Sequence, residues 1–206
     1  MIDSYQILSE SFVIEEEYKK SRFITYVFSC SCYDSMKLAL TKVKVDYPDA
    51  RHYCYAFVGS EPGNMVNCGS SDDGEPAGSA GRPMLAVLQG SNVGEIGIIV
   101  VRYFGGTKLG VGGLVRAYTG GIKRALPQLI TETKLLKDQA RLTCDYAQLS
   151  DVEYLLNKHQ AVIENKTFDA QVGLNVAIPK SAKQQIQTEL VQLSQGQLQF
   201  SFVEKE

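Results

Sequence analysis

The apolar residues of the last third of the chain change repeatedly between a period of two, typical of strands, and a period of 3.6, typical of helices. Strand-like segments cover residues 141–147, 161–170, 171–179 and 197–204, and helical patterns cover 149–159 and 182–194. The predicted order is therefore βαββαβ, which is typical of a ferredoxin-like domain. No other feature of the chain constrains its fold as strongly.

Glycine separates this segment from the rest, because residues 1–135 hold 16 of the 18 glycines. We place a boundary in the polar stretch "ITETKLLKDQ", which gives domains at 1–135 and 136–206. In the first domain we expect an α+β fold with a helical layer on one side of its sheet. The apolar run 96–101 predicts a strand that is buried on both faces. Further elements are expected as strands at 21–30 and 52–59 and helices at 33–48 and 84–92.

Charge and cysteine content restrict the class of protein. The formal net charge is −2, so no overall field attracts nucleic acid or an anionic membrane, and any site for a polyanion must be local. The sequence contains neither a long apolar run nor the residue order of a signal peptide. Five cysteines leave at least one unpaired, as in a reducing compartment. We therefore expect a cytoplasmic protein with structural thiols and no membrane partner.

The segment "VVRYFGGTKLGVGGLVRAYTGGIKRAL" (100–126) is rich in glycine and carries five basic side chains and no acidic one. A buried strand followed by a glycine-rich loop and a helix leaves backbone N–H groups free to bind an anion, with Lys108 beside them. The segment matches neither the phosphate-binding loop nor the dinucleotide fingerprint, so we predict no cofactor.

The helix that follows this loop has two kinds of face. Small residues, including Gly120 and Gly121, predict close packing on the sheet. Arg116 and Lys123 lie on an exposed stripe near Arg124, with no acidic residue to pair locally. Contact with a polyanion and simple solvation of a basic face both remain possible for this stripe.

A second glycine-rich loop, "SSDDGEPAGSAGRPM" (70–84), carries Asp72, Asp73 and Glu75. A calcium loop needs more ligands in a set order, so we predict no metal site. In one interpretation this acidic loop lies against the basic segment, with Arg82 and Arg102 as partners in charge-assisted hydrogen bonds. In the other, its carboxylates lie at the N-terminus of the next helix.

Evidence for catalysis is limited to His52, the only histidine of the first domain, and to Cys54 and several serines that could face it. No motif fixes such a geometry, so we assign no catalytic residue and expect a binding protein, with the enzyme class left open. Among the aromatic residues, Phe104 is expected in the core. Tyr103 and Tyr118 could fill the core or stack on bases.

Four motifs, "KKSRFI", "ARHYCYA", "SDDGEPAGSAGRPML" and "GEIGIIVVRYFGGTKLGVGGLVRAY", together resemble the IMPACT family, and the βαββαβ tail is similar to the second domain of its bacterial members. The resemblance implies a first domain similar to the second domain of ribosomal protein S5. It also implies a second domain similar to the C-terminal domain of elongation factor G. Both of these relatives work on the ribosome, and the resemblance implies no catalytic residue.

We therefore expect a translation-associated regulatory or binding protein that contacts RNA or a ribosomal factor through a basic, glycine-rich surface of the first domain. One alternative is an enzyme or binding protein for a small phosphorylated or anionic metabolite. Another is a protein–protein adaptor that uses the second domain. The candidate residues for binding an anion or nucleic acid are Lys20, Arg22, His52, Arg82, Arg102, Gly105, Gly106, Lys108, Gly110, Arg116 and Lys123.

Overall fold

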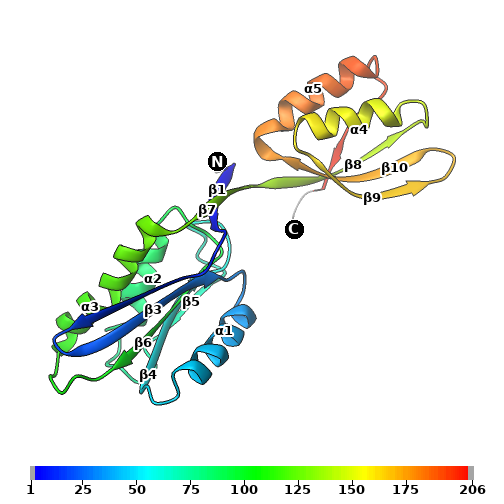
Figure 1. Cartoon of the computed structure of the whole chain (residues 1–206). Helices are drawn as coiled ribbons and strands as arrows, with labels where there is room; N and C mark the ends of the chain where they lie inside the picture. The colour runs from blue at the N-terminus through cyan, green and yellow to red at the C-terminus, as the bar shows by residue number, and fades with distance from the viewer. Residues whose placement is uncertain (1–2, 204–206) are drawn as a thin grey trace. The chain divides into compact units, whose positions relative to one another are not determined.

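A computed structural model describes residues 3–203, which divide into two compact units (Figure 1). The N-terminal unit is Tyr5–Lys134, and the C-terminal unit comprises residues 3–4 and 135–203. Residues 1–2 and 204–206 belong to the outer ends of the two predicted domains, and residue 204 ends the last predicted strand. These five positions lie outside the described residues. Both units combine helices with strands, so the predicted α+β class is confirmed.

The N-terminal unit is built on a five-stranded antiparallel sheet with the order β2-β3-β6-β4-β5. In chain order its strands are β2 (Phe12–Tyr18), β3 (Ser21–Ser29), β4 (His52–Val58), β5 (Cys68–Ser71) and β6 (Ile96–Tyr103). A separate two-stranded sheet joins β1 (Ser4–Leu8) to β7 (Thr131–Leu135). The polar stretch that marks the predicted boundary thus contains β7.

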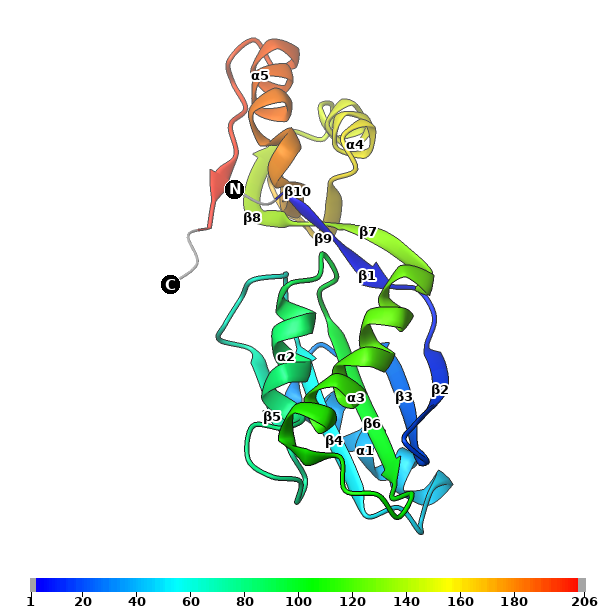
Figure 2. The ribbon, with the colours of Figure 1, turned by 90° about the vertical axis from the view of Figure 1, so that its left-hand side faces the viewer.

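Helices cover both faces of the five-stranded sheet. One face carries α2 (Gly81–Gln89) and α3 (Gly110–Ala125), side by side in Figure 2, and the other carries α1 (Tyr33–Asp46). A short 3-10 helix, η1 (Leu126–Gln128), follows α3. The expectation of helices on one side only is therefore wrong.

The two-sided cover follows from the alternation of side chains along β6. Ile98 and Val100 pack beneath α2 and α3, whereas Ile99 and Val101 pack in the cluster under α1. Because successive side chains point to opposite faces, a strand that is apolar at every position needs a packed layer on each side. The predicted burial of this strand on both faces is confirmed, with all of Ile96–Arg102 buried.

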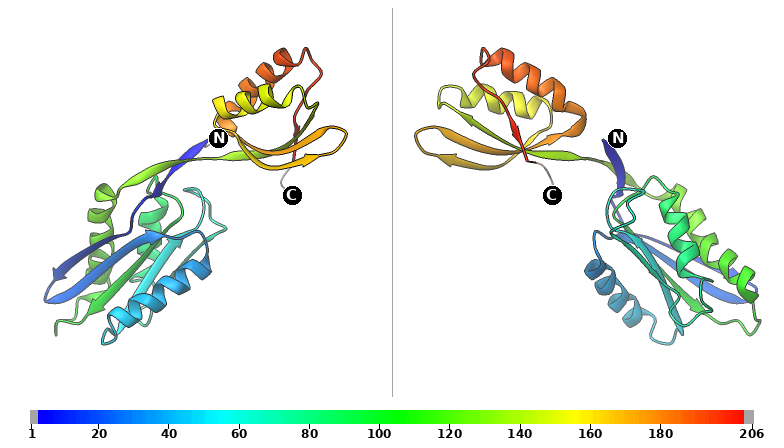
Figure 3. Two further views of the ribbon diagram at one scale, coloured as in Figure 1. Left: turned by 45° about the vertical axis from the view of Figure 1, so that its right-hand side comes forward. Right: turned by 180° about the vertical axis from the view of Figure 1, so that it is seen from behind.

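The C-terminal unit has a four-stranded sheet with the order β11-β8-β10-β9, in which every neighbouring pair is antiparallel. Its two helices lie over the same face of this sheet (Figure 3). In chain order the elements are β8 (Lys137–Cys144), α4 (Leu149–Lys158), β9 (Val162–Phe168), β10 (Val172–Pro179), η2 (Lys180–Ala182), α5 (Lys183–Leu193) and β11 (Ser201–Phe202). This topology confirms the ferredoxin-like prediction.

The sequence did not predict the two edge strands of the larger sheet, β2 and β5. In β2 the side chains of Phe12 and Ile14 alternate with exposed ones, and the strand continues through three glutamates. An edge strand with one solvated face can carry such charges, which weakens the strand pattern in its sequence. Within residues 3–203, no helix combines the length and the apolar character that crossing a bilayer requires.

Candidate anion and nucleic-acid interface

A buried ion pair joins the basic segment to the acidic loop. Nη1 of Arg102, near the end of β6, lies 2.6 Å from Oε1 of Glu75, in the loop before α2. The hydroxyl of Tyr118 in α3 donates a hydrogen bond of 2.8 Å to the same oxygen. The predicted contact between the acidic loop and Arg102 is therefore confirmed, and Tyr118 belongs to the core.

The sheet places Arg102 in this position. Its register partners Phe23 in β3 and His52 in β4 lie on the same face, beneath α2 and α3. The guanidinium lies 5.6 Å from the ring centre of Phe23, and the ring of Tyr118 meets Phe23 edge-on. Burial, with smaller contributions from Cys54 and Glu75, raises the pKa of Tyr118, so its hydroxyl remains a donor.

Asp72 caps the N-terminus of α2. Its carboxylate accepts backbone N–H groups of Gly78, Ala80 and Gly81 at 2.8, 2.9 and 2.8 Å. Burial alone would raise the pKa of Asp72, but these three hydrogen bonds bring it below its usual value. Both interpretations left open by the sequence are therefore correct for part of the loop: Asp72 caps the N-terminus of α2, and Glu75 forms an ion pair with Arg102.

Arg82 does not have the partner predicted for it. Its side chain is exposed on the first turn of α2, and within residues 3–203 it forms no ion pair. Its charge reaches Asp72 only as a minor influence on the pKa of that carboxyl group. The three amides that hold Asp72 come from the first residue of α2 and from the loop just before it, which leaves Asp72 no need for a cationic partner.

His52 lies against the turn of the acidic loop. Its Nδ1 is 2.9 Å from the carbonyl oxygen of Asp73, which can only accept, so Nδ1 carries the hydrogen. The Cys54 thiol donates to the carbonyl oxygen of Asp72 at 2.9 Å, and burial raises the pKa of Cys54 to about 12. At neutral pH this thiol is protonated, so it is not an activated nucleophile. Carboxylate Oδ2 of Asp73 accepts the N–H of Tyr53 at 2.7 Å.

The loop between β6 and α3 lies against the turn between β2 and β3 (Figure 1). A side chain at Gly105 would collide with the carbonyl group of Lys20, and the Gly105 N–H donates to Oγ of Ser21 at 3.1 Å. Gly106 and Gly110 have φ angles of +81° and +70°, which favour glycine. The glycines thus allow two loops distant in sequence to meet at one end of the sheet.

Phe104 lies between two hollows at this end of the sheet. One, of about 290 Å³, is lined by Glu75, Pro76, Arg102, Phe104, Lys108, Leu109, Gly110, Val111 and Leu114. The other, of about 240 Å³, is lined by Asp49, Arg51, Arg102, Tyr103 and Phe104. Phe104 is 53% exposed, so its predicted place in the core is wrong: it follows the last residue of β6, beyond the covered part of the sheet.

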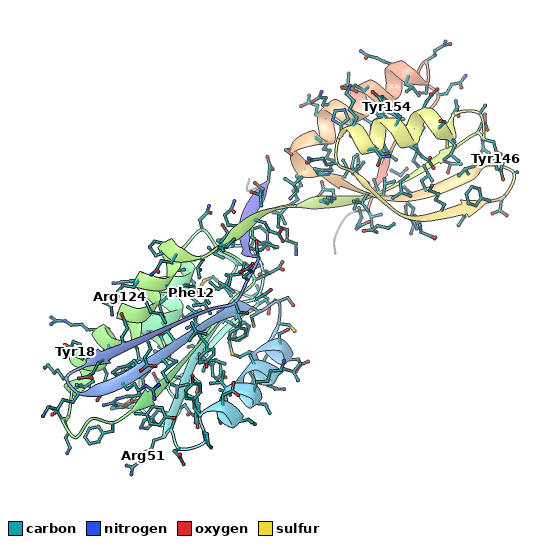
Figure 4. The ribbon with its side chains drawn as sticks, viewed as in Figure 1. Phe12, Tyr18, Arg51, Arg124, Tyr146 and Tyr154 are labelled. Atoms are coloured by element: carbon teal, nitrogen blue, oxygen red, sulfur yellow. The ribbon has the colours of Figure 1, made fainter. Side chains whose placement is uncertain are left out.

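The basic candidates divide into paired and unpaired side chains. Arg22 forms a bidentate ion pair with Glu15 through Nε and Nη2, at 2.5 and 2.7 Å, and Arg124 forms an ion pair with Glu16. Arg51, which the sequence did not single out, immediately precedes β4 and projects outward (Figure 4). Within residues 3–203, the remaining candidates Lys20, Lys108, Arg116 and Lys123 are exposed and have no carboxylate within ion-pair distance.

The structure brings most of these candidates to one end of the N-terminal unit, but not all of them. Lys123 lies about 20 Å along α3 from Gly110, at the helical rise of about 1.5 Å per residue. On the same helix, Gly121 packs against Thr25, where a Cβ atom would collide, as predicted. Gly120 meets only the guanidinium of Arg124, so close packing on the sheet does not explain that glycine.

The two units correspond to two known domain families. Residues 19–126 match the Impact N-terminal domain, and residues 142–197 match a domain of unknown function (DUF1949). The chain is 43% identical over 204 residues to the IMPACT family member YigZ of Escherichia coli, covering 99% of this chain and 100% of that one. The chain belongs to the IMPACT family.

Other IMPACT family members are similar over nearly the whole length. One from Haemophilus influenzae is 42% identical over 200 residues, 97% of each chain. YvyE of Bacillus subtilis is 30% identical over 197 residues, 95% of this chain and 89% of that one. A crystal structure described as that of a hypothetical protein is 43% identical, covers all of both chains and has a TM-score of 0.78. The IMPACT resemblance inferred from the motifs is confirmed.

All the candidate residues lie within the part of the chain that matches the Impact N-terminal domain. Within residues 3–203, no group of three or more histidine, cysteine, aspartate or glutamate side chains is arranged to hold a metal ion. The site of this IMPACT family protein therefore offers an exposed aromatic ring, unpaired basic side chains and a buried ion pair. Such groups are suited to binding by stacking, charge and hydrogen bonding.

Proposed function

We propose that this IMPACT family protein is a translation-associated protein that contacts single-stranded RNA with one end of its N-terminal unit. The observation that carries the proposal is the exposed ring of Phe104, which lies 5.7 Å from the buried guanidinium of Arg102. Lys108 lines one adjoining hollow and Arg51 the other. An aromatic ring on which a base can stack, with cations that contact phosphates, is a common design for binding single strands.

The charge distribution supports a local contact rather than a general affinity for polyanions. The whole chain has a net charge of −2, while Lys108 lines one hollow beside Phe104 and Arg51, together with Asp49, lines the other. Unstacked bases are available in single-stranded RNA and not in a duplex. The association with translation rests on the likeness to ribosomal protein S5 and elongation factor G that the resemblance to the IMPACT family implies for the two domains.

The proposal is tested by fluorescence anisotropy of a labelled single-stranded RNA titrated with the full chain at several salt concentrations. We expect affinity to fall as salt rises, because phosphate contacts release counterions. Phe104→Ala should weaken binding about tenfold or more, in line with about 1–3 kcal/mol for a stacked base. Lys108→Ala should weaken it and reduce the salt dependence.

The matched control for the loss of an aromatic ring is Tyr154→Ala. Tyr154 is 72% exposed on α4 of the C-terminal unit (Figure 4) and lies outside the proposed surface. Absence of RNA binding at low salt, binding that ignores salt, or equal effects of Phe104→Ala and Tyr154→Ala would each contradict the proposal.

A second candidate function, binding of a small phosphorylated metabolite, is favoured by the hollow of about 290 Å³ with Lys108 and Arg102 in its walls. This volume is at the lower end of the range for small-molecule sites. A thermal-shift screen against nucleotides and sugar phosphates, with and without magnesium, tests it. Stabilisation by a sugar phosphate that lacks a base would favour this function over RNA binding.

A further inference from the structure

The buried ion pair leaves part of each partner unused. Arg102 binds Glu75 through Nη1 only, and its buried Nε has no hydrogen-bond partner among residues 3–203. Glu75 receives both of its donors at Oε1, and no donor within the described chain reaches its Oε2. Both residues line the hollow of about 290 Å³ beside Phe104. The floor of this pocket therefore has unused donors next to an unused acceptor.

Comparison with Arg22 shows what the unused edge of Arg102 can bind. In Arg22 the Nε and Nη2 edge forms a fork that holds both oxygens of Glu15. In Arg102 no described residue takes that edge, although the side chain is only 7% exposed. Because this Nε is fully buried, an oxygen or nitrogen acceptor of a ligand would complete the edge after a small shift of the Arg102 side chain toward the hollow.

The charges of Arg102 and Glu75 at the floor of the pocket determine which kind of ligand can bind there. Arg102 and Glu75 neutralise each other, and a ligand that carried only negative charge would face the carboxylate of Glu75 as well as the guanidinium. A neutral group that has an acceptor and a donor side by side satisfies both residues. The remaining walls are mostly apolar, and Phe104 forms one of them, which suits a flat aromatic heterocycle.

We propose that this pocket binds an unstacked nucleobase, and that guanine fits it best. All four bases have an acceptor beside a donor, but guanine alone has the acceptor O6 followed by two N–H donors, N1–H and the N2 amino group, on one edge, with O6 for Arg102 and the donors for Glu75. Phe104 provides the stacking surface, and Lys108, also in the pocket lining, binds a phosphate of the same nucleotide. The inference deepens the proposed RNA contact and rests on it for the source of the base. A free mononucleotide presents the same chemistry.

The experiment is a titration of the full chain with GMP, AMP, CMP and UMP. Calorimetry measures the affinity of each nucleotide, and amide chemical shifts show which residues it contacts. We expect GMP to bind about tenfold or more tightly than the other three, since a matched base edge gives discrimination of this order. The shifted amides should belong to residues 104–114 and to the loop around Glu75. Guanosine should compete with GMP, and inorganic phosphate should compete poorly.

Two variants separate base recognition from stability. Glu75→Gln keeps an oxygen for Arg102 and Tyr118 but replaces the free acceptor with a donor, so GMP affinity should fall about tenfold. Because Glu75 is buried and this variant can fail to fold, Phe104→Ala provides the second test at a side chain that is 53% exposed. It should weaken GMP about tenfold, while Tyr154→Ala leaves GMP binding unchanged.

The outcomes distinguish this inference from the proposed function. RNA binding that does not depend on guanine, with no saturable GMP binding, overturns the base pocket and leaves the RNA contact in place. GMP binding without RNA binding supports the pocket, removes the RNA proposal and makes a free nucleotide the ligand. Equal affinity for all four nucleotides, or displacement of GMP by inorganic phosphate alone, overturns base recognition.

Discussion

Nη1 of Arg102 lies 2.6 Å from Oε1 of Glu75, and the two side chains are only 7% and 4% exposed. The pair connects the end of a central strand to a loop 27 residues earlier in the chain. A charge buried in this way needs its partner, because either ion alone would be left without compensation in a medium of low polarity.

Loss of one partner from this pair should be strongly destabilising. For Arg102→Ala we expect the free energy of unfolding to fall by about 3–5 kcal/mol, because Glu75 would remain buried and uncompensated. Urea denaturation of the full chain measures the change. The control is Arg22→Ala, which breaks the exposed pair with Glu15 and should leave the free energy of unfolding almost unchanged. Similar losses in both variants would show that burial does not govern the strength of the Arg102 pair.

Two glycines in the same segment should respond to alanine with opposite signs. Gly105→Ala would drive a Cβ atom into the carbonyl group of Lys20, so we expect a loss of about 1–3 kcal/mol or more. Gly112→Ala meets no atom within 4 Å and lies inside α3, so we expect a gain of about 0.5–1 kcal/mol from helix propensity. Thermal unfolding compares the variants. Equal effects would contradict the close approach of the two loops.

The cap at Asp72 predicts a specific dependence on pH. Because the pKa of Asp72 is lower in the folded chain than its usual value, its contribution to stability is complete above that usual value. The contribution disappears as the pH falls through the folded pKa. Asp72→Ala should therefore destabilise the protein by about 0.5–2 kcal/mol at pH 7, and the difference from the original chain should shrink below about pH 4.

The control for this dependence is Glu10→Gln, which removes an exposed carboxylate that has no ion-pair partner among residues 3–203. Urea denaturation at a series of pH values gives the curves. A difference between Asp72→Ala and the original chain that stays constant down to pH 2 would contradict a role for the ionised carboxylate.

The cysteines should differ widely in their reaction with iodoacetamide. All five are free thiols, and the Ser35 hydroxyl, followed by its backbone N–H, lowers the pKa of the exposed Cys32. Burial raises the pKa of Cys30 to about 11 and of Cys54 to about 12. Near pH 8 we expect Cys32 to be alkylated well before either of these. Peptide mass spectrometry gives the order, and urea should abolish it; early labelling of Cys54 in the folded chain would contradict its burial.

The periodic patterns predicted most of the fold because they depend on neighbouring residues. Ile96–Val101 is apolar at every position that carries a side chain, and this pattern alone required a strand in the interior. The order of strands and helices along the C-terminal unit followed from the alternation of periods. The edge strand β2 escaped prediction because Glu15 and Glu17 lie on its solvent-exposed face, which is a property of its place in the sheet.

The sequence by itself determined the family, the two α+β domains and the segment that carries the candidate site, since short motifs and periods encode these features locally. A contact between the acidic loop and Arg102 was one of two interpretations of the sequence, and only the tertiary structure showed that Glu75 makes it, that the pair is buried and that Phe104 is exposed. The local sequence around a basic or aromatic residue does not specify which distant loop will pack over it. Its environment depends on where β6 ends and which turns meet there, and that is fixed by the packing of segments far apart in the chain.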